Sequence, residues 1–593
     1  MRDIHLRYAH ESYHEDGQLA TFSLECPEDF NFGYDVVDDI AANDPDRMAM
    51  IWCNPEGEEH FLTFADIRRW SDKTANFLQC HGIGRGDRVM VILRRHYQFW
   101  FVAVALHKLG AVLVPATFML KEHDLEYRLN GAGIKAVIAT DVGDISAVCD
   151  AVAPLCESLV LRMIVNGAGG GTSPLDETGL PVCPAEGALL GSALSGPEGI
   201  CAAPALRDGW IDFNTGVRNA PEGLARCMTR SSDPLLMYFS SGTSGNPKMV
   251  LHDSTYALAH LMTAKHWHGV RHDGIHFTIA DTGWGKAVWG KFYGQWLMES
   301  CVLTYDFDRF SADEVLSLVA RYRLTTFCCP PTMYRLMMQA DVDAYDLTSL
   351  TRLSTAGEAL NPDIFDFWLE HTGLTIYEGF GQTETVVSIG NLMGSKPRSG
   401  SMGKPVPLYT VEVKRSDGSR CNPGETGEIC IKADPHPAGV MTGYYRDPEK
   451  TAEAIHDGWY HTGDTAWCDE DGYLWYVGRN DDVIKSSGYR IGPFEIESVL
   501  LEHPAVRECA VTGVPDELRG CAVKATIVLA PGFEGSPALT QELQAWVKEQ
   551  TAPYKYPRII DYTDELPKTV NGKIRRTAIR EKDYRTDSPL SGA

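Results

Sequence analysis

Tyr238-Phe-Ser-Ser-Gly-Thr-Ser-Gly-Asn-Pro-Lys248-Met-Val250 is the stretch that decides the fold of this chain. The apolar residues 235–239 predict a buried strand, and the small and hydroxyl residues that follow predict a loop. Glycines let a loop turn its backbone N–H groups towards an anion, hydroxyls add donors, and a lysine adds positive charge. The alternative is a Ser/Gly surface turn. The residues that we expect to bind phosphate are Ser240, Ser241, Gly242, Thr243, Ser244, Gly245 and Lys248.

The loop is not a Walker A loop, because Met249 follows Lys248 where that motif has Ser or Thr. Five further segments follow in the order 355–359 (TAGEA), 377–384 (YEGFGQTE), 460–464 (YHTGD), 478–485 (GRNDDVIK) and 567–573 (PKTVNGK). Together they resemble the adenylate-forming superfamily of acyl-CoA synthetases, peptide-synthetase adenylation domains and luciferases. Through residues 280–289 (ADTGWGKAVW) the chain is most similar to medium-chain acyl-CoA synthetases, and the resemblance covers nearly its whole length.

Length and periodicity predict an α/β fold in two parts. A chain of 593 residues is too long for one core. Residues 62–78 have helical spacing with Thr63 as N-cap, and residues 88–93 and 111–114 are strand-like, which predicts a parallel sheet covered by helices. Residues 166–212 lack periodicity and suggest a surface excursion. We expect a large body over 1–480 and a small α+β domain over 481–593, with a helix at 493–501. The resemblance makes Asp481 the hinge about which this small, mobile domain rotates.

Composition excludes several classes of protein. The formal net charge of −26 argues against nucleic acid or an anionic membrane as the main partner. The apolar region 99–114 is interrupted by His107 and Lys108, so no membrane span is expected. Sixteen cysteines without metal-ligand spacing suggest reduced thiols, and residues 1–11 lack the apolar core of a signal peptide. These features predict a cytoplasmic, soluble protein, and they leave a homo-oligomer open.

Activating a carboxylic acid requires its anion to attack the α-phosphorus of ATP. Two negative groups must be held together, so the site needs cations and hydrogen-bond donors. The resemblance implies that Thr383 contacts the α-phosphate, that Glu384 is a Mg²⁺ ligand, and that Lys573 is the catalytic lysine, with Lys248 on the phosphates. It places Asp464 on the ribose hydroxyls and Arg479 near the sugar and phosphate. The remaining ATP-binding residues, which form the adenine slot and its flank, are Gly357, Glu358, Ala359, Glu378, Gly379, Phe380, Gly381 and Gln382.

The second step transfers the acyl group to a thiol, which in the family is coenzyme A. The resemblance implies that Ser487, Gly488, Tyr489 and Arg490 line its tunnel and that Arg519 binds its nucleotide phosphates. Other basic residues close to Lys573 suit a solvated basic helix, and nucleic-acid binding is a weaker alternative.

The acid is expected to be larger than acetate. Acetate-specific relatives carry Trp immediately before Gln-Thr-Glu, where this chain has Gly381. Each additional buried methylene contributes about 0.8 kcal/mol, so the missing indole favours a larger acid. Medium straight-chain, branched and aryl acids all remain open. We expect Trp284, Trp289, Cys328 and Gly381 to form the acyl pocket, although a lone Trp or Cys more often belongs to a core.

These features predict a Mg²⁺-dependent acyl-CoA synthetase whose small-molecule partners are a carboxylic acid, ATP and coenzyme A, with release of AMP and pyrophosphate. One alternative is an adenylating ligase for an aryl or amino acid with a different acceptor. Another is a silent nucleotide- or acyl-binding protein of the same fold. The joint presence of Lys248, Glu384, Asp464 and Lys573 argues against the silent protein.

Overall fold

The computed structural model describes residues 3–165, 205–207, 209–240, 247–358, 360–486, 489–516, 520–552, 554–568 and 574–586. Several predicted site residues lie outside these ranges, and for Tyr489 and Arg490 only the backbone is described. The site residues outside the described ranges are Ser241, Gly242, Thr243, Ser244, Gly245, Ala359, Ser487, Gly488, Arg519 and Lys573.

The first large sheet has nine strands and contains the strand predicted before the phosphate loop. Its centre is parallel, and the outer strands β12, β22 and β9 run antiparallel to their neighbours. In spatial order the strands are β22 (Gly443–Tyr444), β12 (Lys248–Asp253), β11 (Pro234–Ser240), β6 (Val112–Pro115), β5 (Arg88–Ile92), β7 (Ala136–Thr140), β8 (Leu161–Val165), β10 (Trp210–Asp212) and β9 (Ala205–Arg207).

The second large sheet also has nine strands, and its six central strands are parallel. Helices join consecutive parallel strands, which is the connection that a parallel pair requires. In spatial order the strands are β19 (Lys404–Pro405), β18 (Ile389–Gly390), β17 (Ile376–Phe380), β16 (Arg352–Ala356), β15 (Thr326–Cys328), β13 (Ile275–Thr278), β14 (Cys301–Tyr305), β3 (Met48–Cys53) and β4 (Glu59–Thr63).

Helices cover these sheets as the periodicity predicted. Helix α2 begins after Thr63, whose hydroxyl accepts from the Asp66 N–H, while the Asp66 carboxylate accepts from the Thr63 N–H. This capping box explains the sharp start of the helix. The helices of the body are α1 (Asp39–Asn43), α2 (Phe64–Cys80), α3 (Gln98–Leu109), α4 (Glu122–Ala132), α5 (Ile145–Val152), α6 (Phe213–Asn219), α7 (Thr255–Leu261), α8 (Gly285–Lys291), α9 (Tyr293–Leu297), α10 (Ala312–Tyr322), α11 (Pro331–Met337), α12 (Pro362–Thr372) and α13 (Pro448–Ala454).

A smaller antiparallel sheet completes the body. It contains the hairpin that carries Asp464 and Arg479. Its strands are β20 (Val411–Lys414), β21 (Gly427–Lys432), β24 (Trp459–Cys468), β23 (Ile455–His456) and β25 (Leu474–Arg479). A separate hairpin near the N-terminus pairs β1 (Ala9–Tyr13) with β2 (Leu19–Leu24).

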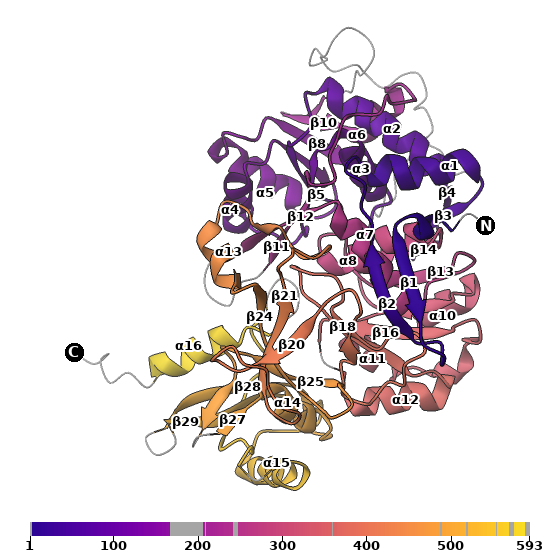
Figure 1. The fold of residues 1–593 in the computed structure, drawn as a ribbon. Helices are drawn as coiled ribbons and strands as arrows, with labels where there is room; N and C mark the ends of the chain where they lie inside the picture. The colour runs from indigo at the N-terminus through magenta and orange to yellow at the C-terminus, as the bar shows by residue number, and fades with distance from the viewer. Residues whose placement is uncertain are drawn as a thin grey trace.

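The elements after Arg479 form a small α+β unit with its own apolar cluster, gathered at one end of the molecule (Figure 1). Helix α14 has the bounds that the sequence predicted. The elements of this unit are β26 (Ile484–Ser486), β27 (Tyr489–Ile491), α14 (Pro493–Leu501), β28 (Val506–Asp516), β29 (Gly520–Leu529), α15 (Pro537–Gln550), β30 (Ile559–Tyr562) and α16 (Arg576–Thr586). The predicted α/β fold with a small α+β C-terminal part is confirmed.

One boundary needs correction. The predicted surface excursion ran to Asp212, but strand β10 begins at Trp210 and pairs in parallel with β8. The Trp210 side chain is fully buried. Three residues are too short for a periodic signal, so the sequence did not reveal this strand. Within the described part of the chain, no helix combines the length and the apolar character needed to cross a membrane.

Candidate active site

A cavity of about 2040 Å³ lies between the two large sheets, the hairpin of β24 and β25, and the small C-terminal unit. The ends of β11 and β17 reach it from the body, and α14 and α16 reach it from the C-terminal side. Carboxyl ends of parallel strands commonly carry the ligand contacts of α/β proteins, because loops and helix N-termini meet there. Most of the described site residues that the sequence predicted line this one cavity.

Ser240 and Lys248 lie opposite each other in the antiparallel pair of β11 and β12. This register closes the predicted phosphate loop and directs both ends of it to the cavity. The Lys248 ammonium donates to the Tyr444 hydroxyl oxygen at 3.2 Å. Tyr444 in turn donates to Glu384 Oε1 at 3.0 Å, and Ser240 Oγ lies 3.5 Å from the same oxygen. A single tyrosine therefore connects the predicted phosphate lysine to the predicted metal ligand.

Glu384 has the properties of a ligand for a hard cation. Glu384 is 8% exposed and lines the cavity. Among the described residues, the hydroxyls of Ser240 and Tyr444 are the polar contacts of its carboxylate, and no lysine or arginine forms an ion pair with it. A buried carboxylate is costly without a compensating charge, and carboxylate oxygen is the donor that Mg²⁺ prefers. These residues therefore fit a Mg²⁺ ion at Glu384.

Asp464 reaches the cavity from a bulge in β24. Glu428 pairs with Thr465 and Cys430 pairs with His461, so β24 carries extra residues at this point. The bulge turns the Asp464 carboxylate towards the cavity, as bulges commonly do at ligand sites. The sequence motif predicted the residue, whereas the bulge that aims it depends on the pairing with β21.

Three side chains hold the Asp464 carboxylate in place. Gln382 donates to Oδ2, and the Tyr476 hydroxyl donates to Oδ1 at 3.1 Å. The Arg479 guanidinium lies 3.9 Å from Oδ1. Tyr460 fixes Gln382 by donating to its amide oxygen at 2.5 Å. The predicted ribose carboxylate and the predicted residues Gln382 and Arg479 thus form one network.

The predicted adenine slot is lined by Gly357, Glu358 and residues 378–380. Gly357 has φ +96°, a left-handed conformation that favours glycine. A Cβ on Gly379 would lie 2.6 Å from Cε2 of Trp267, so a side chain there is excluded. Burial raises the pKa of Glu378 to about 8, and its Oε2 finds no hydrogen-bond partner among the described residues.

The acyl end of the cavity depends on the contact between Gly381 and Trp289. A Cβ on Gly381 would lie 2.4 Å from Cη2 of Trp289 and 2.5 Å from the Val386 carbonyl oxygen. The Trp289 indole therefore approaches from α8 the space next to residue 381, so the glycine leaves less room than its small size suggested. Trp284, which precedes α8, is half-buried and also lines the cavity.

Cys328 does not line this cavity. It is 1% exposed within β15, between β13 and β16 of the second sheet. Burial raises the pKa of its thiol, which keeps it protonated. Alternate residues of a strand face opposite sides of a sheet, and both sides of β15 are buried: Cys328 packs in one apolar cluster and Phe327 in another. The prediction of Cys328 as a pocket residue is therefore corrected to a core residue.

The C-terminal wall of the cavity includes Lys568 and Ile574, which form an isolated antiparallel bridge. Lys568 and Ile574 are the described residues nearest to Lys573 on its two sides. The chain therefore faces the cavity both before and after the predicted catalytic lysine. In the basic helix α16, Arg576 bonds Glu497 at 2.6 Å and Arg580 bonds Asp482 at 2.5 Å. These two arginines make ion pairs and do not belong to a merely solvated surface.

The sequence did not single out Tyr444 or Tyr476. Tyr444 belongs to the short strand β22, which reaches the phosphate end only because it pairs with β12. Tyr476 belongs to β25 and is placed by the pairing with β24. Lys286 was also missed, although it lies in the quoted 280–289 segment. It lines the cavity and donates to the Ala356 carbonyl oxygen at 2.9 Å.

Comparison with protein families gives two matches. The model described as "AMP-binding enzyme" matches residues 37–445, and the "AMP-binding enzyme C-terminal domain" matches residues 495–573. Acyl-coenzyme A synthetase ACSM3 of Pongo abelii, a mitochondrial protein, is 38% identical over 97% of this chain and 95% of its own length. The mitochondrial ACSM5 of Homo sapiens is 40% identical over 94% of this chain and 91% of its own length.

Solved structures show the same fold. The anthranilate CoA ligase AuaEII, in complex with anthranoyl-AMP, matches with a TM-score of 0.80 and 27% identity, over 95% of this chain and 98% of that one. The acyl-CoA synthetase of Brucella canis matches with a TM-score of 0.67 and 31% identity, over 94% of this chain and 95% of that one.

The predicted cytoplasmic location is wrong by this comparison, because the relatives ACSM3, ACSM4 and ACSM5 are mitochondrial. The features behind the prediction argued against secretion but did not distinguish one reducing compartment from another. Many of the described cysteines are free and buried.

The extent of the sequence matches decides which family this chain belongs to. The matched family model spans more than half of the chain, and the relatives align over nearly all of it. The chain belongs to the AMP-binding enzyme family, in which its relatives are acyl-coenzyme A synthetases.

Proposed function

We propose that this protein is a Mg²⁺-dependent acyl-CoA synthetase that converts a carboxylic acid larger than acetate to acyl-AMP and then to acyl-CoA. The observation that carries the proposal is that one cavity contains three kinds of binding group. The Lys248–Tyr444–Glu384 chain suits a metal-bound triphosphate, the held Asp464 carboxylate suits a ribose, and the Trp289 indole forms an apolar wall. The relatives' activity supports the same reaction.

In the first half-reaction the chain must hold two anions together. Lys248 would neutralise the outer phosphates, and Thr383, which also lines the cavity, would donate to the α-phosphate. When bound at Glu384, Mg²⁺ would supply positive charge to the phosphate oxygens. Asp464 would accept from both ribose hydroxyls, since Gln382 and Tyr476 hold its oxygens in place. We assign to Lys573 the charge that offsets the developing negative charge on the attacking and α-phosphate oxygens.

In the second half-reaction the thiol of coenzyme A would attack the acyl-adenylate carbonyl and release AMP. We retain Ser487, Gly488, Tyr489 and Arg490 as its tunnel and Arg519 as a phosphate ligand, on the resemblance alone. Rotation of the small domain about Asp481 would bring these residues to the cavity. The proposed boundary between the domains, residue 480, falls between the two matched family regions.

The size of the acid follows from the acyl wall. At position 381 this chain has glycine where acetate-specific relatives carry a tryptophan, which leaves space for a larger acid. The Trp289 indole occupies part of that space. We therefore propose a medium straight-chain or branched acid. An aryl acid is the second candidate, because the matching ligase AuaEII was solved with anthranoyl-AMP and a flat ring would suit an aromatic wall.

The test is AMP release from ATP and Mg²⁺ for acids from acetate to decanoate, with branched and aryl acids, in the presence and absence of coenzyme A. We expect release that depends on coenzyme A and peaks beyond propionate. Pyrophosphate exchange without coenzyme A separates adenylation from thioester formation. A variant E384Q should lose the Mg²⁺-dependent exchange, whereas E412Q, at the half-buried Glu412 outside the cavity, should keep it.

Exchange without thioester formation would favour a different acceptor. No exchange with any acid would favour the silent binding protein. An optimum at acetate would refute the interpretation of Gly381 and Trp289.

A further inference from the structure

A cluster of three different side chains lies beside the Asp464 bulge, on the small antiparallel sheet. Glu428 and Cys430 belong to β21, and His461 belongs to β24. Cys430 and His461 are direct partners in the antiparallel ladder, so their side chains share one face of the sheet. Glu428 precedes Cys430 by two residues and therefore faces the same way.

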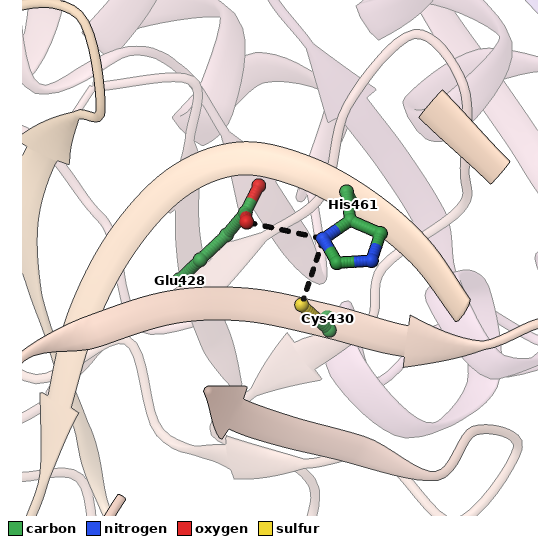
Figure 2. Close-up of side chains that lie close together, drawn as sticks. All are labelled: Glu428, Cys430 and His461. Atoms are coloured by element: carbon green, nitrogen blue, oxygen red, sulfur yellow. Dashed lines mark hydrogen bonds and ion pairs between the residues drawn. The ribbon is translucent and has the colours of Figure 1, made fainter. Parts of the chain in front are cut away.

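The polar atoms of the cluster converge on one point. His461 Nδ1 lies 3.1 Å from Glu428 Oε2 and 3.5 Å from Cys430 Sγ. All three atoms lie within 4.8 Å of one another. Figure 2 shows the carboxylate and the thiol reaching the same ring nitrogen from two sides. Cys430 is buried, while Glu428 and His461 are half-buried and also line the cavity, so an ion has a path from solvent.

A hydrogen bond at Nδ1 can serve only one of its two neighbours at a time. A ring nitrogen has a single in-plane position, which either donates one proton or accepts one. If Nδ1 carries the proton, it donates to Glu428 and leaves the Cys430 thiol without that acceptor. If Nδ1 accepts from the thiol, the Glu428 carboxylate faces its lone pair. An ion at the centre removes the conflict, because all three atoms would then direct lone pairs at the ion.

We propose that Glu428, Cys430 and His461 bind a divalent transition-metal ion of the Zn²⁺ type. A thiolate, an imidazole and a carboxylate are donors for a borderline ion, and they do not suit Mg²⁺, which prefers oxygen alone. Tetrahedral Zn²⁺ with ordinary bond lengths places its donor atoms roughly 3.3–3.6 Å apart. The separations from Nδ1 are 3.5 Å to Cys430 Sγ, within this range, and 3.1 Å to Glu428 Oε2, slightly below it. Binding would release the Cys430 proton to solvent, and water from the cavity would take the fourth position.

This site is separate from the one proposed at Glu384, but it is connected to the bulge. The second oxygen of Glu428, Oε1, accepts from the Gly463 N–H at 2.9 Å. Gly463 directly precedes Asp464 and has φ +70°. An ion that fixes the Glu428 carboxylate would therefore also brace the turn that presents the ribose carboxylate. Residues that support a metal ligand or its surroundings commonly have such a coupled role.

The experiment is a Co²⁺ titration of the full-length protein after removal of metals with a chelator. Co²⁺ replaces Zn²⁺ in such sites and has a thiolate charge-transfer band in the near ultraviolet and strong visible bands when tetrahedral. We expect both signals to saturate at one equivalent and to disappear when Zn²⁺ is added. C430S should lose the thiolate band, and H461Q and E428Q should bind at least about tenfold more weakly.

Two matched controls make the result specific. C468S removes another free thiol from β24, and E370Q changes an exposed carboxylate on α12. Both variants should titrate like the wild type. Circular dichroism of each variant checks that it is folded. H461Q tests the site without altering the buried thiol, in case C430S is unstable.

A wild-type protein with no thiolate band, a band that persists in folded C430S, or an unchanged Co²⁺ affinity in folded H461Q would overturn the site. Equal loss in C468S would show that Co²⁺ binds surface thiols and would also overturn it.

Discussion

At the scale of single residues, the phosphate end of the cavity depends on a hydroxyl that no motif contains. Tyr444 accepts from Lys248 and donates to Glu384, so it keeps a cation and a carboxylate at a fixed separation. Burial and the charge of Glu384 raise the pKa of Tyr444 well above its usual value, so the hydroxyl keeps its proton. The two charged groups are thereby arranged before any nucleotide binds, and an arrangement made in advance is the main source of electrostatic stabilisation in catalysis.

Replacing Tyr444 by Phe should slow adenylation. Hydrogen bonds to charged groups contribute about 1.5–3 kcal/mol, so we expect a loss of roughly tenfold to a hundredfold in kcat/KM for ATP. Pyrophosphate exchange measures this loss, and an increased Mg²⁺ requirement should accompany it because Glu384 loses a fixed partner. Y445F is the control, since Tyr445 is the next residue and no described contact joins its hydroxyl to Lys248 or Glu384. Equal effects in both variants would contradict the bridging role.

Glu378 gives a prediction about pH and stability. Burial raises its pKa to about 8 in the folded protein, whereas an unfolded glutamate has a pKa of about 4.3. Between these two values the folded state binds more protons than the unfolded state, so the free energy of unfolding should fall as pH rises from about 4.3 to about 8. The change is of the order of several kcal/mol.

E378Q should remove this part of the pH dependence and make the protein more stable than the wild type at pH 8. Urea unfolding at a series of pH values, without nucleotide, tests it. The exposed α12 residue Glu370 supplies the control E370Q, which should follow the wild type. An unchanged slope in E378Q would show that Glu378 is ionised in the folded state.

At the scale of elements, helix α8 and the end of strand β17 together set the acyl pocket. Strand β17 ends at Phe380, and the chain continues through Gly381 against the indole that α8 presents. Trp289 is held edge-to-face by His260 and by Trp267, at ring distances of 6.1 Å each. The helix therefore carries a rigid wall, and the wall determines how deep an acid reaches.

W289F should shift the preferred acid towards longer chains. The smaller ring removes part of the wall, and each additional methylene that it admits contributes about 0.8 kcal/mol, or roughly fourfold in kcat/KM. Values of kcat/KM for acids from butyrate to decanoate measure the shift. W284F changes the half-buried tryptophan that precedes α8, and it should shift the dependence of kcat/KM on chain length less than W289F does. A profile unchanged in W289F would show that the indole does not limit the acid.

At the scale of the whole molecule, ion pairs tie helix α16 of the small C-terminal unit to the segment around the predicted hinge. Arg580 of α16 bonds Asp482, and Arg479 Nε lies 3.5 Å from the carboxylate of the predicted hinge residue Asp481. The residues that flank the Lys573 range face the cavity in this arrangement. The arrangement therefore suits the first half-reaction, in which Lys573 is proposed to act.

R580Q should weaken adenylation by a few fold and leave thioester formation from preformed acyl-adenylate unchanged. The reason is that an ion pair of this partly buried kind contributes modestly, on the order of 1 kcal/mol. Pyrophosphate exchange and single-turnover transfer to coenzyme A measure the two steps separately. K555Q, which breaks the Lys555–Glu495 pair elsewhere in the same unit, is the control. Equal losses in both half-reactions would indicate general destabilisation.

The predictable part of this protein has short-range causes. The bounds of α2 follow from a capping box, and those of α14 follow from a proline at its start. The phosphate loop, the ATP motifs and the glycine at 381 could be found because each is a local pattern with a local chemical reason. Cys328 could not be placed, because the sequence does not distinguish a thiol in a core from one at a pocket wall. Strand β10 could not be placed, because three residues are too few to show a periodic pattern.

The sequence by itself determined the α/β class, the family resemblance and the residues that the motifs contain, since periodicity and motif spacing are properties of neighbouring residues. Only the tertiary structure decided that Tyr444 joins Lys248 to Glu384, that Trp289 limits the room beside Gly381, and that Glu428, Cys430 and His461 meet. Each of these contacts joins residues on different elements. Strand pairing and helix packing bring such residues together, and no local pattern in the chain encodes their distances.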